Sequence, residues 1–154
     1  MTTQATTSTE QQVLAVLADQ AAAITAGDAR RALGHLGPGF VGFDLAPPLE
    51  LSGPQVYDPA GLASWFESWD GPVGLDIGEP SVLAGGDVAF TYGLSHMHGV
   101  KADGQPVDLW YRTTVGLRRI DGDWKIVHEH KSTPFLMDGS DKAALDLKPE
   151  RPAG

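Results

Sequence analysis

The sequence predicts an α+β domain in which helices come first and long strands follow. Before residue 71, apolar residues recur in two segments at the three- and four-residue spacing of helices. Alternating patterns typical of strands then fill most of residues 73–135. Within this second part, a tight Asp121-Gly122-Asp123 turn separates two long alternating segments and predicts an antiparallel hairpin. Helices packed on one face of a curved sheet accommodate these observations.

The length and composition of the chain narrow the classes of protein to which it can belong. Its 154 residues fit one domain, and the lack of cysteine excludes disulfides, thiolate zinc sites and cysteine nucleophiles. A net charge of -9 disfavours nucleic acid and anionic membranes as partners. No apolar run approaches the ~20 residues of a membrane span. Because residues 1–8 are polar and lack the features of a signal peptide, we expect them to be disordered and the protein to be soluble and cytoplasmic.

The first two predicted helices follow residues that can cap their amino ends. Thr9 and Gln12 could form a capping box, and the apolar residues that follow keep helical spacing up to Ile24. Gly27 is a natural stop for this helix. Asp28 can cap a short second helix that continues to about residue 35.

A third helix begins at Asp58-Pro59, which combines a capping aspartate with proline at the first helical position. Leu62, Trp65, Phe66 and Trp69 follow on one side of this helix, and Gly71-Pro72 ends it.

The predicted strands form a meander with one additional strand before the third helix. Residues 40–44 read as that first strand, and the Pro47-Pro48 pair shortly after it cannot continue a central strand. Three strands or strand pairs follow at about 73–84, 87–100 and 107–120, and residues 124–135 close the sheet. We therefore predict a single domain over residues 9–137 and an irregular tail over residues 138–154 that could lie over the surface.

Alternation along the strands sorts their side chains onto two faces. If Ile120 pairs with Trp124 across a three-residue loop, Glu129 lies opposite Val115. One face is then bulky and contains Phe90, Tyr92, His96, His98, Trp110, Arg112, Ile126, His128 and His130. The other face has smaller residues on one strand and contains Ser95, Met97, Tyr111, Thr113, Val115, Glu129 and Lys131. Small residues beneath a helix layer leave room for a ligand pocket, and the bulky face is large enough to pack on another subunit.

A second arrangement of the hairpin stays open at this point. Trp124 and Ile126 could form a single core face, which would leave Lys125, Glu129 and Lys131 in water. Composition does not choose between the two arrangements.

Several segments of the chain match the pattern of one known family. They are FDLAPPL (43–49), FESWDGPVG (66–74), GDVAFTYGL (86–94), DLWYRTT (108–114), RRIDGDWKIVHEHKSTPF (118–135) and the tail over 137–149. On these segments the chain resembles the SnoaL-like, ketosteroid-isomerase-like branch of the nuclear transport factor 2 (NTF2-like) superfamily. The superfamily includes isomerases, cyclases, dehydratases and non-catalytic binders, so the resemblance is more specific for fold than for activity.

The resemblance implies a cone-shaped α+β barrel with N-terminal helices on a strongly curved, mixed and mostly antiparallel sheet. It implies a ligand pocket between the helices and the concave face, and a homodimer formed through the convex face. The residues expected to contact a ligand are Tyr57, Trp65, Trp69, Met97, Tyr111, Thr113 and Lys131. The residues expected at the subunit interface or in a supporting layer are His96, Trp110, Arg112, His128 and His130.

Asp44 is the first candidate for a catalytic base, and Glu129 is the second. In ketosteroid isomerases the base is an aspartate that ends the first strand before a proline, and Asp44 occupies the equivalent stretch with Leu45 in place of that proline. The tyrosine and second aspartate of that enzyme's oxyanion hole have no identifiable counterparts, which argues against steroid isomerisation. Asp44 could instead simply form a turn. Glu129 could instead pair with Lys131 or an arginine.

The two His-x-His pairs, at 96–98 and 128–130, have the spacing of metal ligands. No carboxylate shares their face in the register above, so we predict interface histidines and no metal site. Arg112 beside Trp110 is expected to stack or to form a buried pair.

Three functions are compatible with the sequence. The first is a cofactor-independent isomerase, cyclase or dehydratase acting on a small, largely apolar carbonyl compound. In it Asp44 or Glu129 would abstract a proton, and Tyr111 or Lys131 would stabilise the oxyanion. The second is a non-catalytic binder of a small ligand, and the third is a structural dimer module with a vestigial pocket.

Overall fold

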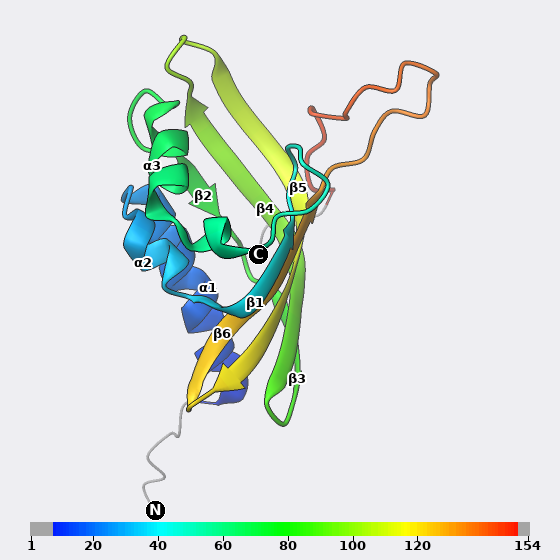
Figure 1. Cartoon of the computed structure of the whole chain (residues 1–154). Coiled ribbons are helices and arrows are strands. Elements are labelled where there is room, and N and C mark those ends of the chain that lie inside the picture. Colours follow the sequence, from blue (N-terminus) through cyan, green and yellow to red (C-terminus); the bar gives the residue numbers. More distant parts are fainter. Residues whose placement is uncertain (1–7, 151–154) are drawn as a thin grey trace, which may run out of the picture.

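The structure is a computed structural model that describes residues 8–150, and its helices lie against one face of a curved sheet (Figure 1). The helices are α1 (Thr9–Thr25), α2 (Ala29–Leu33), the 3-10 helix η1 (Pro54–Tyr57) and α3 (Pro59–Glu67). The strands are β1 (Leu36–Phe43), β2 (Gly74–Asp76), β3 (Ser81–Gly85), β4 (Val88–Val100), β5 (Pro106–Ile120) and β6 (Asp123–Ser132). Apart from Ser8, the segment predicted to be disordered lies outside the described residues.

The sheet is mixed and mostly antiparallel, as the resemblance implied, and within the described residues it is curved but not closed into a complete barrel. Its strand order is β1-β6-β5-β4-β2, and β3 also pairs with β4. The β1–β6 pair is parallel, whereas the other pairs are antiparallel. The predicted strand or strand pair over 73–84 is a pair, and β2 and β3 lie against opposite ends of β4.

Helix α1 begins one residue earlier than the sequence predicted. The side chain of Ser8 accepts a hydrogen bond from the backbone of Gln11, and the side chain of Gln11 accepts one from the backbone of Ser8. Gln12, the predicted capping partner of Thr9, instead accepts a hydrogen bond from Nε1 of Trp124 at 3.2 Å. The capping box is therefore Ser8 and Gln11, and Gln12 ties the helix to the sheet.

The β5–β6 hairpin has a shorter turn than predicted. Asp121 and Gly122 form a two-residue turn with φ values of 52° and 87°, and Ile120 pairs with Asp123 instead of Trp124. A left-handed conformation at both turn residues matches the twist of the flanking strands. The predicted three-residue loop is therefore wrong, because the Asp-Gly pair is sufficient for the turn.

A β-bulge in β6 compensates for the shorter turn. Leu117 pairs with Ile126 and Gly116 pairs with His128, so Val127 has no partner on β5. Beyond this extra residue Glu129 does lie opposite Val115, as predicted. Between the turn and the bulge the shorter turn sets the register, so Ile126 pairs with Leu117 and lies in the core instead of on the predicted bulky face.

The core lies between α1 and the concave face of the sheet. Val13 and Leu17 project from α1, and the sheet contributes Phe40, Ala89, Val115, Leu117, Trp124 and Ile126. Helix α1 continues past this core along the sheet (Figure 1), and its next inward residues, Gln20, Ala21 and Ile24, line a cavity. No helix within residues 8–150 has the length and apolar character needed to cross a membrane.

The chain after β6 forms a hairpin-like segment, residues 133–147, which we call the C-terminal arm. Leu136 donates a backbone hydrogen bond to Lys142, and Ala144 donates one to Pro134. Figure 1 shows this segment, in orange to red, projecting away from the body of the molecule. The predicted irregular tail is therefore partly ordered through its own hydrogen bonds.

Candidate functional site

A cavity of about 70 Å³ lies between α1 and the concave face of the sheet. Its apolar wall comes from α1, from β2 and from the segment between β2 and β3: Leu17, Ala21, Ile24, Leu75, Ile77 and Pro80. Its more polar wall comes from α1, β4, β5 and β6: Gln20, Thr91, Gly93, Ser95, Tyr111, Thr113, Val115, Glu129 and Lys131. Typical ligand pockets measure ~300–1,000 Å³, so this cavity suits a small molecule or the reacting end of a larger one.

Strand alternation explains the hydroxyl groups along the polar wall. Ser95 pairs with Tyr111 and Thr91 pairs with Val115 across β4 and β5, so their side chains share the concave face. The hydroxyls of Ser95 and Thr113 lie 3.0 Å apart, and Thr91 is buried. Because these side chains are short, the floor of the cavity stays open beneath α1.

Glu129 and Lys131 form an ion pair on the β6 side of the cavity. They are two residues apart on one strand and therefore point to the same face, with 3.5 Å between Nζ of Lys131 and Oε2 of Glu129. Their side chains are 14% and 28% exposed, respectively. Burial alone would lower the pKa of Lys131, but the charges of Glu129 and then Asp44 outweigh it and raise that pKa. Lys131 is therefore a cation at neutral pH.

Tyr111 is buried in the same wall and remains neutral. Burial is the main reason that its pKa lies above the ordinary value of 10.0. Lys131 opposes this shift, whereas Glu129 and Asp44 add to it. Its phenol can thus donate a hydrogen bond into the cavity across the neutral pH range.

Asp44 lies near the Glu129–Lys131 end of the cavity but outside its lining. It directly follows β1, where Phe43 pairs with His130 of the parallel strand β6. The side chain is exposed, and Oδ1 accepts a hydrogen bond from the backbone N–H of Leu45 at 2.7 Å. This bond is to the next residue, whereas an Asx turn is closed by the N–H two residues on, so it does not support the turn-forming alternative. The carboxylate still contributes to the raised pKa values of Lys131 and Tyr111.

Four of the predicted ligand contacts do not line this cavity. Tyr57 donates its hydroxyl to the carbonyl of Gly37 at 2.7 Å and so holds η1 to β1. Met97 is half-buried next to Leu75 in the β2–β4 ladder. The structure places Tyr111, Thr113 and Lys131, the other three, in the lining.

The remaining two, Trp65 and Trp69, form a separate cluster with Lys101. The Lys101 ammonium lies 4.1 Å from the ring centroid of Trp69 and 5.9 Å from that of Trp65. This cation–π arrangement fastens the end of α3 to the β4–β5 turn.

The predicted interface residues lie on the convex face, on the side of the sheet opposite the cavity. His96 stacks on Trp110 with 4.5 Å between ring centroids, and its Nε2 lies 2.6 Å from Oδ1 of Asp108. His128 contacts the backbone carbonyl of Val41 through Nδ1, and Arg112 donates to Ser132. Within residues 8–150 no three histidine or carboxylate side chains are grouped to hold a metal ion.

Sequence reasoning missed the cavity residues of α1 and of the β2–β3 segment. Helical spacing marked Leu17, Ala21 and Ile24 as inward-facing but did not distinguish core from cavity. Thr91 and Ser95 were on the predicted concave face and could have been identified from that parity. No feature of the sequence indicated that Gln20 and Pro80 would line the cavity.

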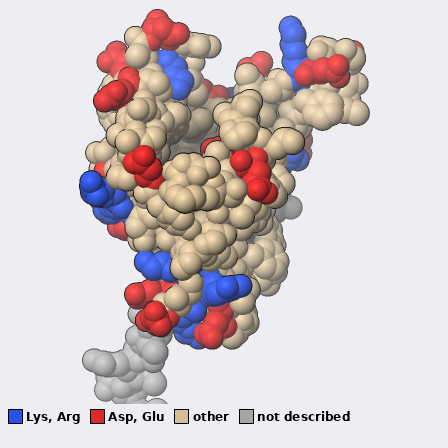
Figure 2. Space-filling model, viewed as in Figure 1, with Lys and Arg blue, Asp and Glu red and all other residues tan. Residues whose placement is uncertain are grey.

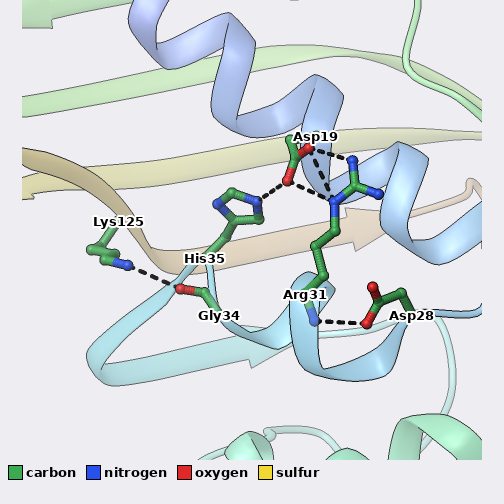
Figure 3. Close-up of polar contacts among 6 residues, drawn as sticks. All are labelled: Asp19, Asp28, Arg31, Gly34, His35 and Lys125. Carbon is green, nitrogen blue, oxygen red and sulfur yellow. Dashed lines mark hydrogen bonds and ion pairs between the residues drawn. The ribbon is translucent and has the colours of Figure 1, made fainter.

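A second polar cluster, shown in Figure 3, gives His35 a partner that the sequence did not reveal. Asp19 of α1 accepts hydrogen bonds from the Arg31 guanidinium, and its Oδ2 lies 2.6 Å from Nε2 of His35. Arg31 first and His35 second lower the pKa of Asp19 to about 2. The cluster joins α1, α2 and the start of β1, and it does not line the cavity.

This combination of helices on an open curved sheet, with a cavity on the concave face, defines an NTF2-like α+β protein. The model of the SnoaL-like domain family matches residues 13–136, and the chain belongs to that family. A search of curated proteins gave no match.

Solved structures share the same fold. An NTF2-like protein of unknown function from Pseudomonas putida KT2440 is 28% identical, with 91% of this chain and 96% of that chain covered and a TM-score of 0.79. A candidate dehydratase of the NTF2-like family from Streptomyces avermitilis is 17% identical, with 85% of this chain and 100% of that chain covered and a TM-score of 0.70. The association domain of C. elegans CaMKII is 17% identical, with 80% of this chain and 95% of that chain covered and a TM-score of 0.61.

Proposed function

We propose that the concave cavity binds a small, largely apolar carbonyl compound and catalyses proton transfer at the carbon next to the carbonyl, without a cofactor. The observation that carries this proposal is the convergence of the Glu129–Lys131 ion pair and the Tyr111 hydroxyl on one wall of a cavity whose other wall is apolar. A carboxylate next to two hydrogen-bond donors is the apparatus that enolate formation requires.

Each polar group has a distinct role in this proposal. The Glu129 carboxylate removes the proton from carbon, and the electron pair of the broken C–H bond moves onto the carbonyl oxygen. Tyr111 and Lys131 donate hydrogen bonds to the resulting oxyanion. Return of the proton at another carbon gives isomerisation, attack on a second carbonyl gives cyclisation, and expulsion of a β-hydroxyl as water gives dehydration.

We assign the base to Glu129 and keep Asp44 as the second candidate. A general base must lie within hydrogen-bond reach of the proton that it removes. Glu129 lines the cavity, whereas Asp44 lies outside the lining and its Oδ1 is already bonded to Leu45. Asp44 supports the site by adding negative charge near Lys131 and Tyr111.

Hydrogen–deuterium exchange at carbon tests the proposal without knowledge of the natural substrate. Cyclopentanone and cyclohexanone are incubated in D₂O with the protein, and loss of the protons next to the carbonyl is followed by proton NMR. We expect exchange above the buffer rate, and Glu129→Gln should reduce the enzymatic part by about 10²–10⁴-fold. Glu67→Gln, an exposed carboxylate on α3, is the matched control and should have no effect.

The two candidate bases are separated by comparing their amide variants. Asp44→Asn should slow the exchange by less than Glu129→Gln, with Asp70→Asn as its exposed control. If Asp44→Asn abolishes exchange while Glu129→Gln retains it, our assignment of the base is wrong. If the wild-type protein gives only the buffer rate with both ketones, the catalytic proposal fails for this class of compound.

The alternative is a protein that binds the same kind of ligand without reacting with it. The engagement of Glu129 in an ion pair favours this alternative, because a paired carboxylate can be structural. Here the ketones would raise the unfolding temperature of the wild type, of Asp44→Asn and of Glu129→Gln alike, with no proton exchange. A structural module would show neither effect, and the open cavity argues against it.

We also propose a homodimer formed through the convex face. On this face β4 presents Val88, Phe90, Tyr92 and Leu94, all of them exposed, and Leu83 of β3 is exposed beside Phe90. A contiguous apolar stripe on a sheet face is typical of an interface. Light scattering should give twice the chain mass at micromolar concentration, and a monomer there would contradict the proposal.

A further inference from the structure

The C-terminal arm, residues 133–147, is ordered by its own contacts. Besides the backbone bonds at Leu136 and Ala144, the Thr133 hydroxyl donates to the carbonyl of Ala144 at 3.1 Å. At the tip, the Asp138 carboxylate accepts a hydrogen bond from the backbone N–H of Ser140, which closes the turn. These hydrogen bonds within the arm give it a defined shape.

The arm exposes large apolar side chains to solvent, which is unusual for a segment that contacts no other molecule. Phe135, Leu136, Met137, Leu145 and Leu147 are all exposed, and Met137 reaches 88%. Figure 1 shows the arm projecting away from the sheet, and Figure 2 shows charged side chains beside uncharged surface in the same region. An ordered, projecting segment with exposed apolar groups fits contact with another molecule.

Both ends of the arm are fastened to residues of the convex face. At its start, Ser132 accepts a hydrogen bond from Nε of Arg112 at 3.1 Å. Just beyond its end, Nζ of Lys148 lies 2.9 Å from Oδ2 of Asp108. The other oxygen of the same carboxylate, Oδ1, contacts His96. The arm thus leaves and returns to the face that we propose as the dimer interface.

The convex face is complementary to the arm in both polarity and charge. The pairing of β4 with β5 puts Arg118 beside Val88 and Arg112 beside Leu94, so arginines bracket the apolar stripe at both ends. Within residues 8–150 neither arginine forms an ion pair, and neither Asp138 nor Asp141 at the tip of the arm forms one. In a chain with a net charge of -9, two arginines on one face without an ion pair in the described part of the chain favour an acidic partner.

We propose that the C-terminal arm packs across the convex face of a second copy of this chain. Phe135 and Met137 then lie against the partner's apolar stripe, and the acidic tip lies near one of the two arginines that flank the stripe. In a two-fold dimer each chain provides one arm and one face, so both patches are covered at once. The inference rests on the proposed homodimer and adds the arm as the element that holds it together.

Sedimentation equilibrium of the full chain tests this proposal. We expect Phe135→Ser with Met137→Ser to raise the dimer dissociation constant at least tenfold over the wild type. Leu49→Ser is the matched control, because Leu49 is 96% exposed on a loop outside both the arm and the convex face. The circular dichroism spectrum and unfolding temperature of the dilute monomer should be the same in all three proteins.

A fluorescent label gives a second readout. The chain has no cysteine, so Met137→Cys can carry a single environment-sensitive dye. Its emission should shift to shorter wavelength as concentration rises through the dissociation constant. An unchanged emission, or a double variant that dimerises as tightly as the wild type, overturns the role of the arm and leaves the dimer intact. A wild type that is monomeric at every concentration overturns the dimer itself, and the arm with it.

Discussion

Lys131 and Glu129 are the residues on which the cavity depends most. Replacing Lys131 with methionine removes the cation and leaves the half-buried carboxylate of Glu129 unpaired. We expect the free energy of unfolding to fall by about 1–2 kcal/mol, below the ~3–5 kcal/mol of a fully buried pair because both side chains keep some contact with water. Urea unfolding at pH 7 measures this loss.

Lys131→Arg is the conservative control, since it keeps the positive charge beside Glu129. Its stability should lie closer to the wild type than that of Lys131→Met. Equal losses in the two variants would show that the shape of the lysine side chain, not its charge, stabilises the wall.

Tyr111 should be recognisable by its titration. Because its folded pKa is raised, the folded chain holds the phenolic proton more tightly than the unfolded chain does. The stability from this group is therefore present below pH 10 and is lost as pH rises through the folded pKa. Absorbance at ~295 nm reports tyrosinate, and Tyr111→Phe should remove a phase above the ordinary pKa of 10.0. If the titration phase that Tyr111→Phe removes has its midpoint at or below pH 10.0, the burial of this phenol is contradicted.

The Asp19 cluster should protect the fold against mild acid. The pKa of the Asp19 carboxyl is lowered from 3.8 to about 2. The stability that this carboxylate contributes is therefore fully present above pH 3.8 and is lost as pH falls toward 2. Asp19→Asn should therefore unfold a few degrees lower than the wild type at pH 6, and the difference should shrink below pH 3.8. Asp70→Asn serves as the exposed control. A difference that stays constant down to pH 2 would mean that the carboxylate charge plays no part.

At the scale of the elements, strand alternation predicted most of the sheet but not the end of the hairpin. Parity placed Ser95, Thr113 and Lys131 on one face, and the structure brings them together. The turn was predicted one residue too long, and the bulge at Val127 was not predicted. The two errors cancel beyond the bulge, because each changes the register by one residue. A bulge residue such as valine has no local sequence signal that distinguishes it from an ordinary strand residue.

Helical spacing likewise defined faces without identifying what they contact. It correctly grouped Trp65 with Trp69, although α3 ends at Glu67, two residues before Trp69. It did not show that Lys101, which follows β4 in the sequence, would lie over both rings. A contact between residues far apart in the chain depends on how the elements are packed, which periodicity within one helix does not encode.

The two-residue turn predicts a specific sensitivity at Gly122. Its φ of 87° is left-handed, so a side chain there is strained by about 1–2 kcal/mol. We expect Gly122→Ala to lower the free energy of unfolding by that amount. Gly85→Ala is the control, because Gly85 has an ordinary φ and no atom within 4 Å of an added Cβ. Equal effects at both positions would contradict the role of backbone conformation in this turn.

At the scale of the whole molecule, dimerisation through the convex face should appear in thermal stability. A ligand or subunit that binds only the folded state stabilises it by mass action. The unfolding temperature should therefore rise by a few degrees for each tenfold increase in protein concentration. The Phe135→Ser, Met137→Ser double variant should show a weaker dependence. A wild-type temperature that does not change with concentration would count against a folding-linked dimer.

The bulge at Val127 divides β6 into two parts with separate tasks. Before it, the even-numbered residues Trp124 and Ile126 belong to the core, and after it the odd-numbered residues Glu129 and Lys131 line the cavity. Because the change of parity occurs at a single residue, the cavity half of this strand can be redesigned for new ligands while the half that holds the fold stays untouched. The extra residue is itself dispensable for this arrangement, since deleting Val127 would leave Ile126 followed by His128 in regular alternation and keep Glu129 and Lys131 on the concave face.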